Sequence, residues 1–441
     1  ICDYNYVFDP RAYLRRFFGE SKKGEYLFLI DEAHNLAERG REMYSALICK
    51  EDILKIRSKV KETGSKKLLR ALGKCNRQLL EMKRKCSDFF RVLPGPGALP
   101  VSVAGLQAEL ENYLEEVPEG ELRKEVLEFY FQVNTFLNVC DLLDENYVVY
   151  TYHDGAGRFY LRLFCVNPAG NLQQVLSDGK GTVFFSATLL PIAYYRKLLG
   201  SADGEDYAIY VESPFPEENR KILIGREVSS RYRRRGPREY EKIACYIHEI
   251  LSARRGNYLI FFPSYQMMEE VLDVFRQRYQ GEEGLQYLIQ SPSMKEAQRE
   301  EFMQSFEESH DYTLAGFCVM GGIFSEGIDL TGEKLIGAVL VGTGLPGLGV
   351  EREILMKYYD EHGEKGFDYA YRYPGMNKVL QAAGRVIRTG RDRGVVALLD
   401  DRFLTEEYLR LFPREWKEYH SCRIGEMEVI LKEFWSDSCF S

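Results

Sequence analysis

Short, unbroken apolar runs alternate with helical patterns along most of this chain. The runs at residues 26–30 and 182–185 have the length of a strand, and neither alternates with polar positions. Such runs are typical of parallel strands that are covered on both faces. After residues 213–216 (Ser-Pro-Phe-Pro), strand and helix patterns follow each other in turn, which predicts a parallel sheet joined by right-handed crossovers. We expect its strands near 221–225, 257–262, 286–290, 314–320, 335–341 and 394–399, and its helices near 239–253, 264–279, 294–308 and 376–389.

Between residues 50 and 145 the apolar positions recur at helical spacing instead. The breaker Pro-Gly-Pro-Gly at 94–97 divides this segment into two limbs of opposite charge. Residues 50–91 hold 14 basic residues against 5 acidic ones, and residues 105–145 hold 11 acidic residues against Arg123 and Lys124. The opposite charges can pack the limbs together. Alternatively, the basic limb can contact a nucleic-acid backbone.

Composition narrows the class of protein. At 441 residues the chain is long enough for roughly three domains. A net charge of −8 argues against a protein that coats nucleic acid non-specifically. The ten cysteines are scattered without a Cys-x-x-Cys pair, which predicts reduced thiols and a cytoplasmic location. No apolar run is long enough to span a bilayer, so we expect no membrane partner. Because the sequence starts at Ile1 within an aromatic segment, we expect a piece of a longer protein.

Two adjacent carboxylates, Asp31 and Glu32, directly follow the first apolar run, and His34 comes two residues later. Ligands of parallel sheets bind at the carboxyl ends of the strands. In nucleoside triphosphatases the first acid at this place holds Mg²⁺ and the second orients the attacking water. The alternative is an acidic helix start, which the helix dipole favours.

Three further motifs follow in order. Ser186 and Thr188 end the second apolar run and could relay hydrogen bonds. The stretch 322–329 is glycine-bearing and contains Glu326, Gly327 and Asp329; its glycines would let the backbone approach a phosphate. The last motif is 381–388, Gln-Ala-Ala-Gly-Arg-Val-Ile-Arg, within the helix predicted at 376–389.

Arg385 and Arg388 stand three residues apart, which would place them on one face of that helix. Two guanidinium groups there could reach a γ-phosphate and stabilise the charge that grows in the transition state. The alternative is a pair of surface charges.

The order of these four motifs resembles that of a superfamily 2 DEAH-box helicase. Residues 2–6, 213–216 and 259–265, and a helical insertion between the first motif (residues 31–34) and the second (residues 186–188), resemble the XPD/DinG branch. The resemblance implies an α/β fold with two RecA-like parallel-sheet domains, the first incomplete, and an all-helical Arch-like insertion. The expected domains are 1–45 and 146–212 (helicase domain 1), 46–145 (insertion) and 213–441 (helicase domain 2).

The resemblance also implies an ATP-dependent DNA helicase that translocates 5′→3′ on single-stranded DNA, with single-stranded or forked duplex DNA as its partner and a monomer as its working state. Asp31 would hold Mg²⁺ through water, Glu32 would act on the attacking water, and His34 would couple hydrolysis to motion. The other implied catalytic residues are Gln381, Arg385 and Arg388; the nucleotide-coupling residues are Ser186, Thr188, Glu326, Gly327 and Asp329; and the DNA-binding residues are Ser264, Tyr265, Gln290 and Ser291.

Two departures limit this interpretation. A phosphate loop needs Gly-x-x-x-x-Gly-Lys-Ser/Thr, and the nearest stretch, Gly179-Lys180, is followed by Gly181. The four cysteines that hold a 4Fe-4S cluster in this family have no counterpart here, since only Cys2 precedes Asp31. We expect both features in a missing N-terminal part, and we expect this chain alone to be inactive. The alternative is a non-catalytic nucleic-acid-binding protein with a degenerate helicase fold.

Overall fold

The computed structural model describes residues 1–18, 25–201, 206–279, 281, 283–324 and 330–436. The chain forms two compact units. Unit 1 comprises Ile1–Ser186, Ile192–Asp206 and Gly349–Glu364, and unit 2 comprises Ala187–Pro191, Tyr207–Leu348 and Lys365–Ser441. In the described residues, no helix is both long enough and apolar enough to cross a membrane.

A seven-stranded parallel sheet forms the centre of unit 2, in the order β13-β7-β12-β11-β8-β10-β9. This confirms the α/β class and the second parallel-sheet pattern. The strand at the β13 edge was not predicted, because its Tyr-His-Ser-Cys sequence lacks an apolar run. The strands are β7 (Arg220–Gly225), β8 (Asn257–Phe262), β9 (Leu285–Ile289), β10 (Thr313–Val319), β11 (Gly337–Val341), β12 (Gly394–Leu399) and β13 (Tyr419–Cys422).

Helices cover both faces of this sheet, so its central strands are apolar throughout; all six residues of β8 are buried. One face packs on α10 (Pro237–Ala253), α11 (Tyr265–Tyr279) and α16 (Met427–Ser436), and the other on α12 (Glu296–Glu307) and α14 (Tyr373–Ala383). Shorter elements complete the unit: α15 (Glu406–Leu409), a π-helix at Asp368–Arg372, and 3-10 turns at Glu217–Asn219, Tyr232–Arg234, Gly332–Lys334, Asp401–Leu404 and Arg414–Trp416.

In unit 1, β1 (Leu27–Ile30) and β6 (Gly181–Phe184) form a two-stranded parallel sheet. Phe28 and Ile30 are buried, whereas Leu27 and Leu29 on the other face are 73% and 72% exposed. The prediction that both faces of β1 are covered is therefore wrong for the described residues. Around this sheet lie α1 (Asn5–Phe8), α2 (Arg15–Phe18), a 3-10 turn (Ala33–Asn35), α3 (Leu36–Met43), α8 (Ala169–Leu176) and α9 (Ile192–Leu198).

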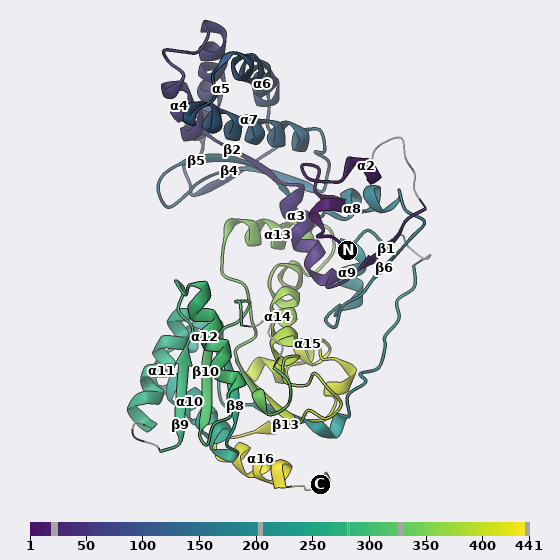
Figure 1. Cartoon of the computed structure of the whole chain (residues 1–441), viewed down its shortest axis with the longest axis vertical. Coiled ribbons are helices and arrows are strands. Elements are labelled where there is room, and N and C mark those ends of the chain that lie inside the picture. The colour runs from purple at the N-terminus through teal and green to yellow at the C-terminus, as the bar shows by residue number, and fades with distance from the viewer. Residues whose placement is uncertain (19–24, 202–205, 280, 282, 325–329, 437–441) are drawn as a thin grey trace. The chain divides into compact units, whose positions relative to one another are not determined.

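The insertion is a helical layer on a four-stranded antiparallel sheet of order β2-β5-β4-β3. Figure 1 shows its helices gathered over one side of these strands. The helices are α4 (Lys50–Lys59), α5 (Lys66–Lys85), α6 (Leu99–Glu116) and α7 (Glu121–Cys140); the strands are β2 (Ala46–Cys49), β3 (Phe90–Leu93), β4 (Tyr147–His153) and β5 (Phe159–Cys165).

The insertion thus differs from the all-helical expectation. The expected domains assign residues from 146 onward to helicase domain 1, but the strands at 147–153 and 159–165 pair with β3 and β2 of the insertion. The preceding helix α3 ends at Met43, and Ala46 begins strand β2.

Ion pairs join the oppositely charged limbs of the insertion. Lys59 and Lys55 on α4, in the basic limb, both pair with Glu125 on α7, in the acidic limb. For these lysines the packing interpretation of the charge pattern holds.

Helix α13 (Val350–Glu361) comes from late in the chain but packs in unit 1. Arg352 forms an ion pair with Glu38 on α3 at 2.9 Å, and Glu351 accepts hydrogen bonds from Arg162 and Tyr150, both at 3.2 Å. The expected domain of residues 213–441 thus contains a helix whose contacts are with the first unit.

Candidate active site

The strand pairing in unit 1 brings the first two motifs together. Ile30 on β1 lies opposite Phe184 on β6. The ladder continues past both strands, because Phe185 N–H donates to Ile30 O at 3.0 Å and Ala33 N–H donates to Phe185 O at 3.2 Å. The residues after the two strands are therefore held side by side.

Glu32 has a left-handed backbone conformation, with φ 46° and ψ 41°. For a residue with a Cβ this costs on the order of 1–2 kcal/mol, and such strain is typical of functional sites. Two groups hold the conformation: Glu32 N–H donates to Asp31 Oδ1 at 2.7 Å, and the Tyr4 hydroxyl lies within hydrogen-bond distance of the carbonyl oxygens of both Asp31 and Glu32. Burial, and then the charges of Glu32 and Asp31, raise the pKa of Tyr4 to about 12.

Glu32, Ser186 and His34 form a hydrogen-bonded set. Ser186 Oγ donates to Glu32 Oε2 at 3.2 Å and lies 2.8 Å from His34 Nδ1. His34 Nδ1 is also 3.3 Å from Glu32 Oε2, and its side chain is buried whereas that of Glu32 is 58% exposed. A hydroxyl has a single proton to donate. When Ser186 uses it in the hydrogen bond to Glu32, its oxygen accepts a hydrogen bond from His34, whose Nδ1 then carries a hydrogen. The set links an exposed carboxylate to a buried imidazole.

The exposed carboxylate of Asp31 is the candidate Mg²⁺ ligand. Mg²⁺ is commonly held by one or two carboxylates together with waters and substrate phosphates. A single exposed carboxylate beside an acid that could bind water fits this mode of binding. Among the described residues there is no group of three or more His, Cys, Asp or Glu that could hold a metal by protein ligands alone.

Gln381 lies on α14, but Arg385 and Arg388 do not lie on a helix. The helix ends at Ala383, with Gly384 as its C-cap, so the prediction that both arginines share a helix face is wrong. The buried carboxylate of Asp392 accepts hydrogen bonds from the backbone N–H groups of Arg388 and Thr389, both at 2.7 Å.

Asp392 also accepts from Gly332 N–H at 3.1 Å and from the Thr389 hydroxyl at 2.6 Å. Burial alone would raise the pKa of Asp392, but these hydrogen bonds lower it overall. Asp392 is therefore the anchor of the arginine-bearing loop. Sequence reasoning missed it, because a single Asp in a basic loop carries no motif.

The predicted DNA-contacting residues follow strands β8 and β9, which pair with β10 on its two sides. Gln290 is 4% exposed; it donates to the Tyr265 hydroxyl at 3.0 Å and accepts from Val319 N–H at 2.9 Å. Ser264 Oγ accepts from Met267 N–H at the start of α11, and Ser291 Oγ lies 3.3 Å from Ser293 Oγ. Gln290 thus positions Tyr265 and the end of β10, and Ser291 remains exposed.

Two motifs are only partly placed. Glu326, Gly327 and Asp329 lie outside the described residues. Ser186 belongs to unit 1, whereas Thr188, which is buried, belongs to unit 2. The Ser-Ala-Thr motif therefore contains the point at which the chain passes from one unit to the other.

Comparisons with known proteins agree with the motifs. A family model described as the helicase C-terminal domain matches residues 247–419. The ATP-dependent DNA helicase XPD of Sulfolobus acidocaldarius is 24% identical over 392 residues, which cover 86% of this chain and 65% of that protein. The ATP-dependent DNA helicase chl-1 of Caenorhabditis elegans is 24% identical over 285 residues, which cover 62% of this chain and 34% of that protein. The chain thus spans less than two thirds of the length of these relatives.

Solved structures share the fold. A structure of apo XPD aligns with a TM-score of 0.60 at 20% identity, over 95% of this chain and 81% of that one. The structure of Xpd4 of S. tokodaii aligns with a TM-score of 0.61 at 18% identity and the same coverage. The resemblance to XPD/DinG-type superfamily 2 helicases is confirmed.

Proposed function

We propose that this chain, which is of the XPD/DinG type of superfamily 2 helicases, is the motor portion of an ATP-dependent DNA helicase that moves 5′→3′ along single-stranded DNA. The observation that carries the proposal is the hydrogen-bonded set of Glu32, Ser186 and His34. The names of the matched relatives, which are ATP-dependent DNA helicases, support the same reaction class.

In this proposal Asp31 holds Mg²⁺, which would neutralise charge on the phosphates of ATP. Glu32 orients the attacking water, and its left-handed backbone aims the carboxylate into solvent, where 58% of the side chain is exposed. These 441 residues contain no phosphate loop, so hydrolysis requires one from outside them.

Ser186 is proposed to couple hydrolysis to movement. Its hydroxyl contacts Glu32 and His34, and at the next residue, Ala187, the chain enters unit 2. A change at the Glu32 carboxylate would alter the hydrogen bonds of Ser186 and so reach the segment that joins the units. Glu326, Gly327 and Asp329 are proposed to link nucleotide and DNA, and Ser264, Tyr265, Gln290 and Ser291 to contact the DNA strand.

Arg385 and Arg388 are proposed to supply positive charge to the γ-phosphate in the transition state, with Gln381 as a sensor of that phosphate. The loop that carries the arginines is fixed by Asp392, and a positioned arginine of this kind contributes on the order of 10³-fold or more to turnover.

The test is the DNA-stimulated ATPase of the intact protein that contains this chain. Arg385→Ala should lower turnover by on the order of 10³-fold. The matched control is Arg391→Ala, an exposed arginine of the same loop, which should leave turnover within about twofold. Full activity in the Arg385→Ala protein would refute the assignment.

A second experiment examines coupling. Ser186→Ala should preserve most of the ATPase while duplex unwinding falls, and Ser186→Thr, which keeps the hydroxyl, should restore unwinding. If ATPase and unwinding fall in parallel in Ser186→Ala, the serine has no separate coupling role.

A non-catalytic nucleic-acid-binding protein is the second candidate, and the missing phosphate loop favours it. Such a protein should bind single-stranded DNA tightly without nucleotide, and its affinity should not change when ATP analogues are added. A titration of the chain with DNA, with and without an analogue, distinguishes the two candidates.

A further inference from the structure

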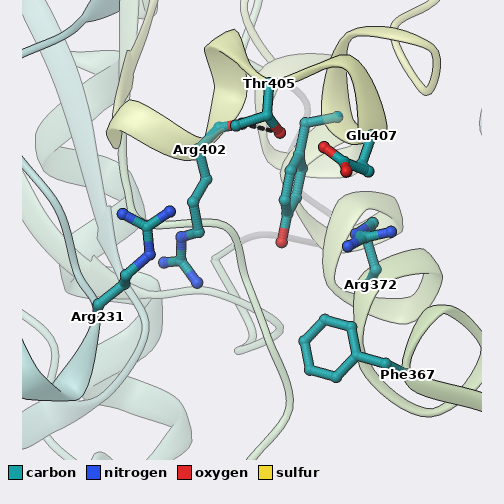
Figure 2. A pocket seen from close by; sticks show the side chains of 7 residues that line it. Arg231, Phe367, Arg372, Arg402, Thr405 and Glu407 are labelled. Atoms are coloured by element: carbon teal, nitrogen blue, oxygen red, sulfur yellow. Dashed lines mark hydrogen bonds between the residues drawn. The ribbon is translucent and has the colours of Figure 1, made fainter.

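A pocket in unit 2 is lined by none of the residues assigned above. It has a volume of about 390 Å³ and is lined by Arg231, Phe367, Arg372, Arg402, Thr405, Glu407 and Tyr408. Figure 2 shows Arg231 and Arg402 on one side of the pocket and Arg372 and Phe367 on the other. Arg231 follows β7, and Arg402 follows β12, so the pocket lies at the carboxyl ends of adjacent parallel strands, where ligands of such sheets bind.

Buried carboxylates hold two of these arginines in place. Arg402 Nε and Nη2 each donate to an oxygen of the fully buried Asp400 at 2.8 Å, and Nη2 also donates to Ser230 Oγ at 2.6 Å. Arg372 forms an ion pair with Asp368, which is 2% exposed and also accepts from Arg410 at 3.0 Å. Because the anchors fix each guanidinium before a ligand arrives, little side-chain entropy is lost on binding.

The anchored arginines keep N–H groups for a ligand. A guanidinium carries five N–H donors; Arg402 uses its Nε and Nη2 atoms, and Arg231 donates to Asp401 through Nη1 alone. Arg372 donates to Asp368 through Nη1. A π-helix, Asp368–Arg372, carries this side chain, and single π-helical turns are frequent at functional sites.

Aromatic rings complete the pocket. The Arg372 guanidinium lies 5.5 Å from the centre of the Phe367 ring and 5.4 Å from that of Tyr408. The Phe367 ring stacks on that of Tyr371, with centroids 5.4 Å apart, and it remains 42% exposed, so the exposed part of the ring can contact a base. The lining residues include one carboxylate, Glu407. Its negative charge would repel a polyanion that fills the pocket, so a ligand that places a single phosphate there is favoured.

We propose that this pocket binds one phosphate group of a nucleotide, with the attached base against Phe367. Planar guanidinium forks match phosphate oxygens, and contact between the base and the exposed part of the ring adds affinity without base specificity. The phosphate belongs either to a single-stranded DNA or to a free nucleotide. The proposal concerns binding alone and does not rest on hydrolysis.

The experiment compares two charge reversals in the full 441-residue chain. Arg231→Glu changes a lining residue, and Arg233→Glu makes the same charge change at an exposed arginine two residues away that does not line the pocket. Binding of fluorescein-labelled oligothymidylate is measured by anisotropy, and binding of ATP by calorimetry. A lost contact to a phosphate should weaken one of these ligands about tenfold in Arg231→Glu, and Arg233→Glu should change it less than twofold.

The ligand that weakens identifies the source of the phosphate: a strand if oligothymidylate alone is affected, a free nucleotide if ATP is. Phe367→Ala should weaken the same ligand. Equal effects of the two reversals would mean general electrostatics and overturn the proposal, as would an unmodified chain that binds neither probe. Failure of the helicase assignment would instead appear in the ATPase of the intact protein.

Discussion

Glu32 combines backbone strain with a functional carboxylate. Glycine adopts a φ of 46° without a steric cost, whereas the Cβ of alanine causes the same steric strain there as the Cβ of glutamate. We therefore expect Glu32→Gly to be about 1 kcal/mol more stable than Glu32→Ala, the reverse of the order seen in helices and strands. Urea denaturation of the two variants measures the difference; a more stable alanine variant would show that the strain is absent.

Asp392 predicts a pH dependence. Hydrogen bonds hold its pKa below the usual value of Asp, so its stabilisation is present above the unfolded pKa of about 3.9 and is lost as the pH falls through the lower folded pKa. Asp392→Asn should lower the free energy of unfolding by about 1–3 kcal/mol at pH 7. The gap between the variant and the unmodified chain should narrow in urea denaturation below pH 4, and a constant gap would contradict the assignment.

At the residue scale, the sequence predicted contacts that follow from strand ends. Asp31, Glu32, His34 and Ser186 each follow a short apolar run, and parallel pairing of the two runs places them together. The end of α14 could not be predicted in this way. The apolar residues Val386 and Ile387 continue a helical pattern, but the N–H groups beyond them bond to Asp392, a side-chain contact that no periodicity reveals.

At the scale of elements, β1 is buried on one face only. Leu29 is 72% exposed, whereas its neighbour Phe28 is 8% exposed. Leu29→Lys should change the free energy of unfolding by less than about 0.5 kcal/mol. The matched change Phe28→Lys should cost about 3 kcal/mol or more, because it removes a buried ring and buries an amine. Thermal unfolding of both variants tests the pattern, and equal losses would mean that both faces are covered.

Strand positions in unit 2 agree with the sequence to within about two residues, because unbroken apolar runs occur where helices cover both faces of a sheet. Pairing partners were harder to predict. Nothing in the residue pattern at 147–153 and 159–165 indicates that these strands join Ala46–Cys49 and Phe90–Leu93 rather than β1. Short strands at sheet edges carry too few residues to show a period.

At the scale of the whole molecule, α13 connects late residues to unit 1. Glu351 bonds with Tyr150 and Arg162, and Arg162 has only 18% of its side chain exposed. Because Glu351 is itself 43% exposed, Glu351→Ala should destabilise unit 1 by only about 1 kcal/mol. Hydrogen exchange should quicken in residues 147–165 and stay unchanged in 257–262.

Glu353→Ala is the control for this experiment, since Glu353 is an exposed acid two residues further along the same helix. It should alter neither region. Faster exchange in 257–262 after Glu351→Ala would mean that α13 supports unit 2 instead.

The path of the chain through the two units has a consequence for proteolysis. The backbone passes between the units five times, after residues 186, 191, 206, 348 and 364. A protease that cuts once, between residues 206 and 207, leaves the N-terminal fragment with residues 187–191 of unit 2 and the C-terminal fragment with α13 of unit 1. Each fragment then retains an element that the other needs, and the nicked protein should elute as one species until a denaturant separates the fragments.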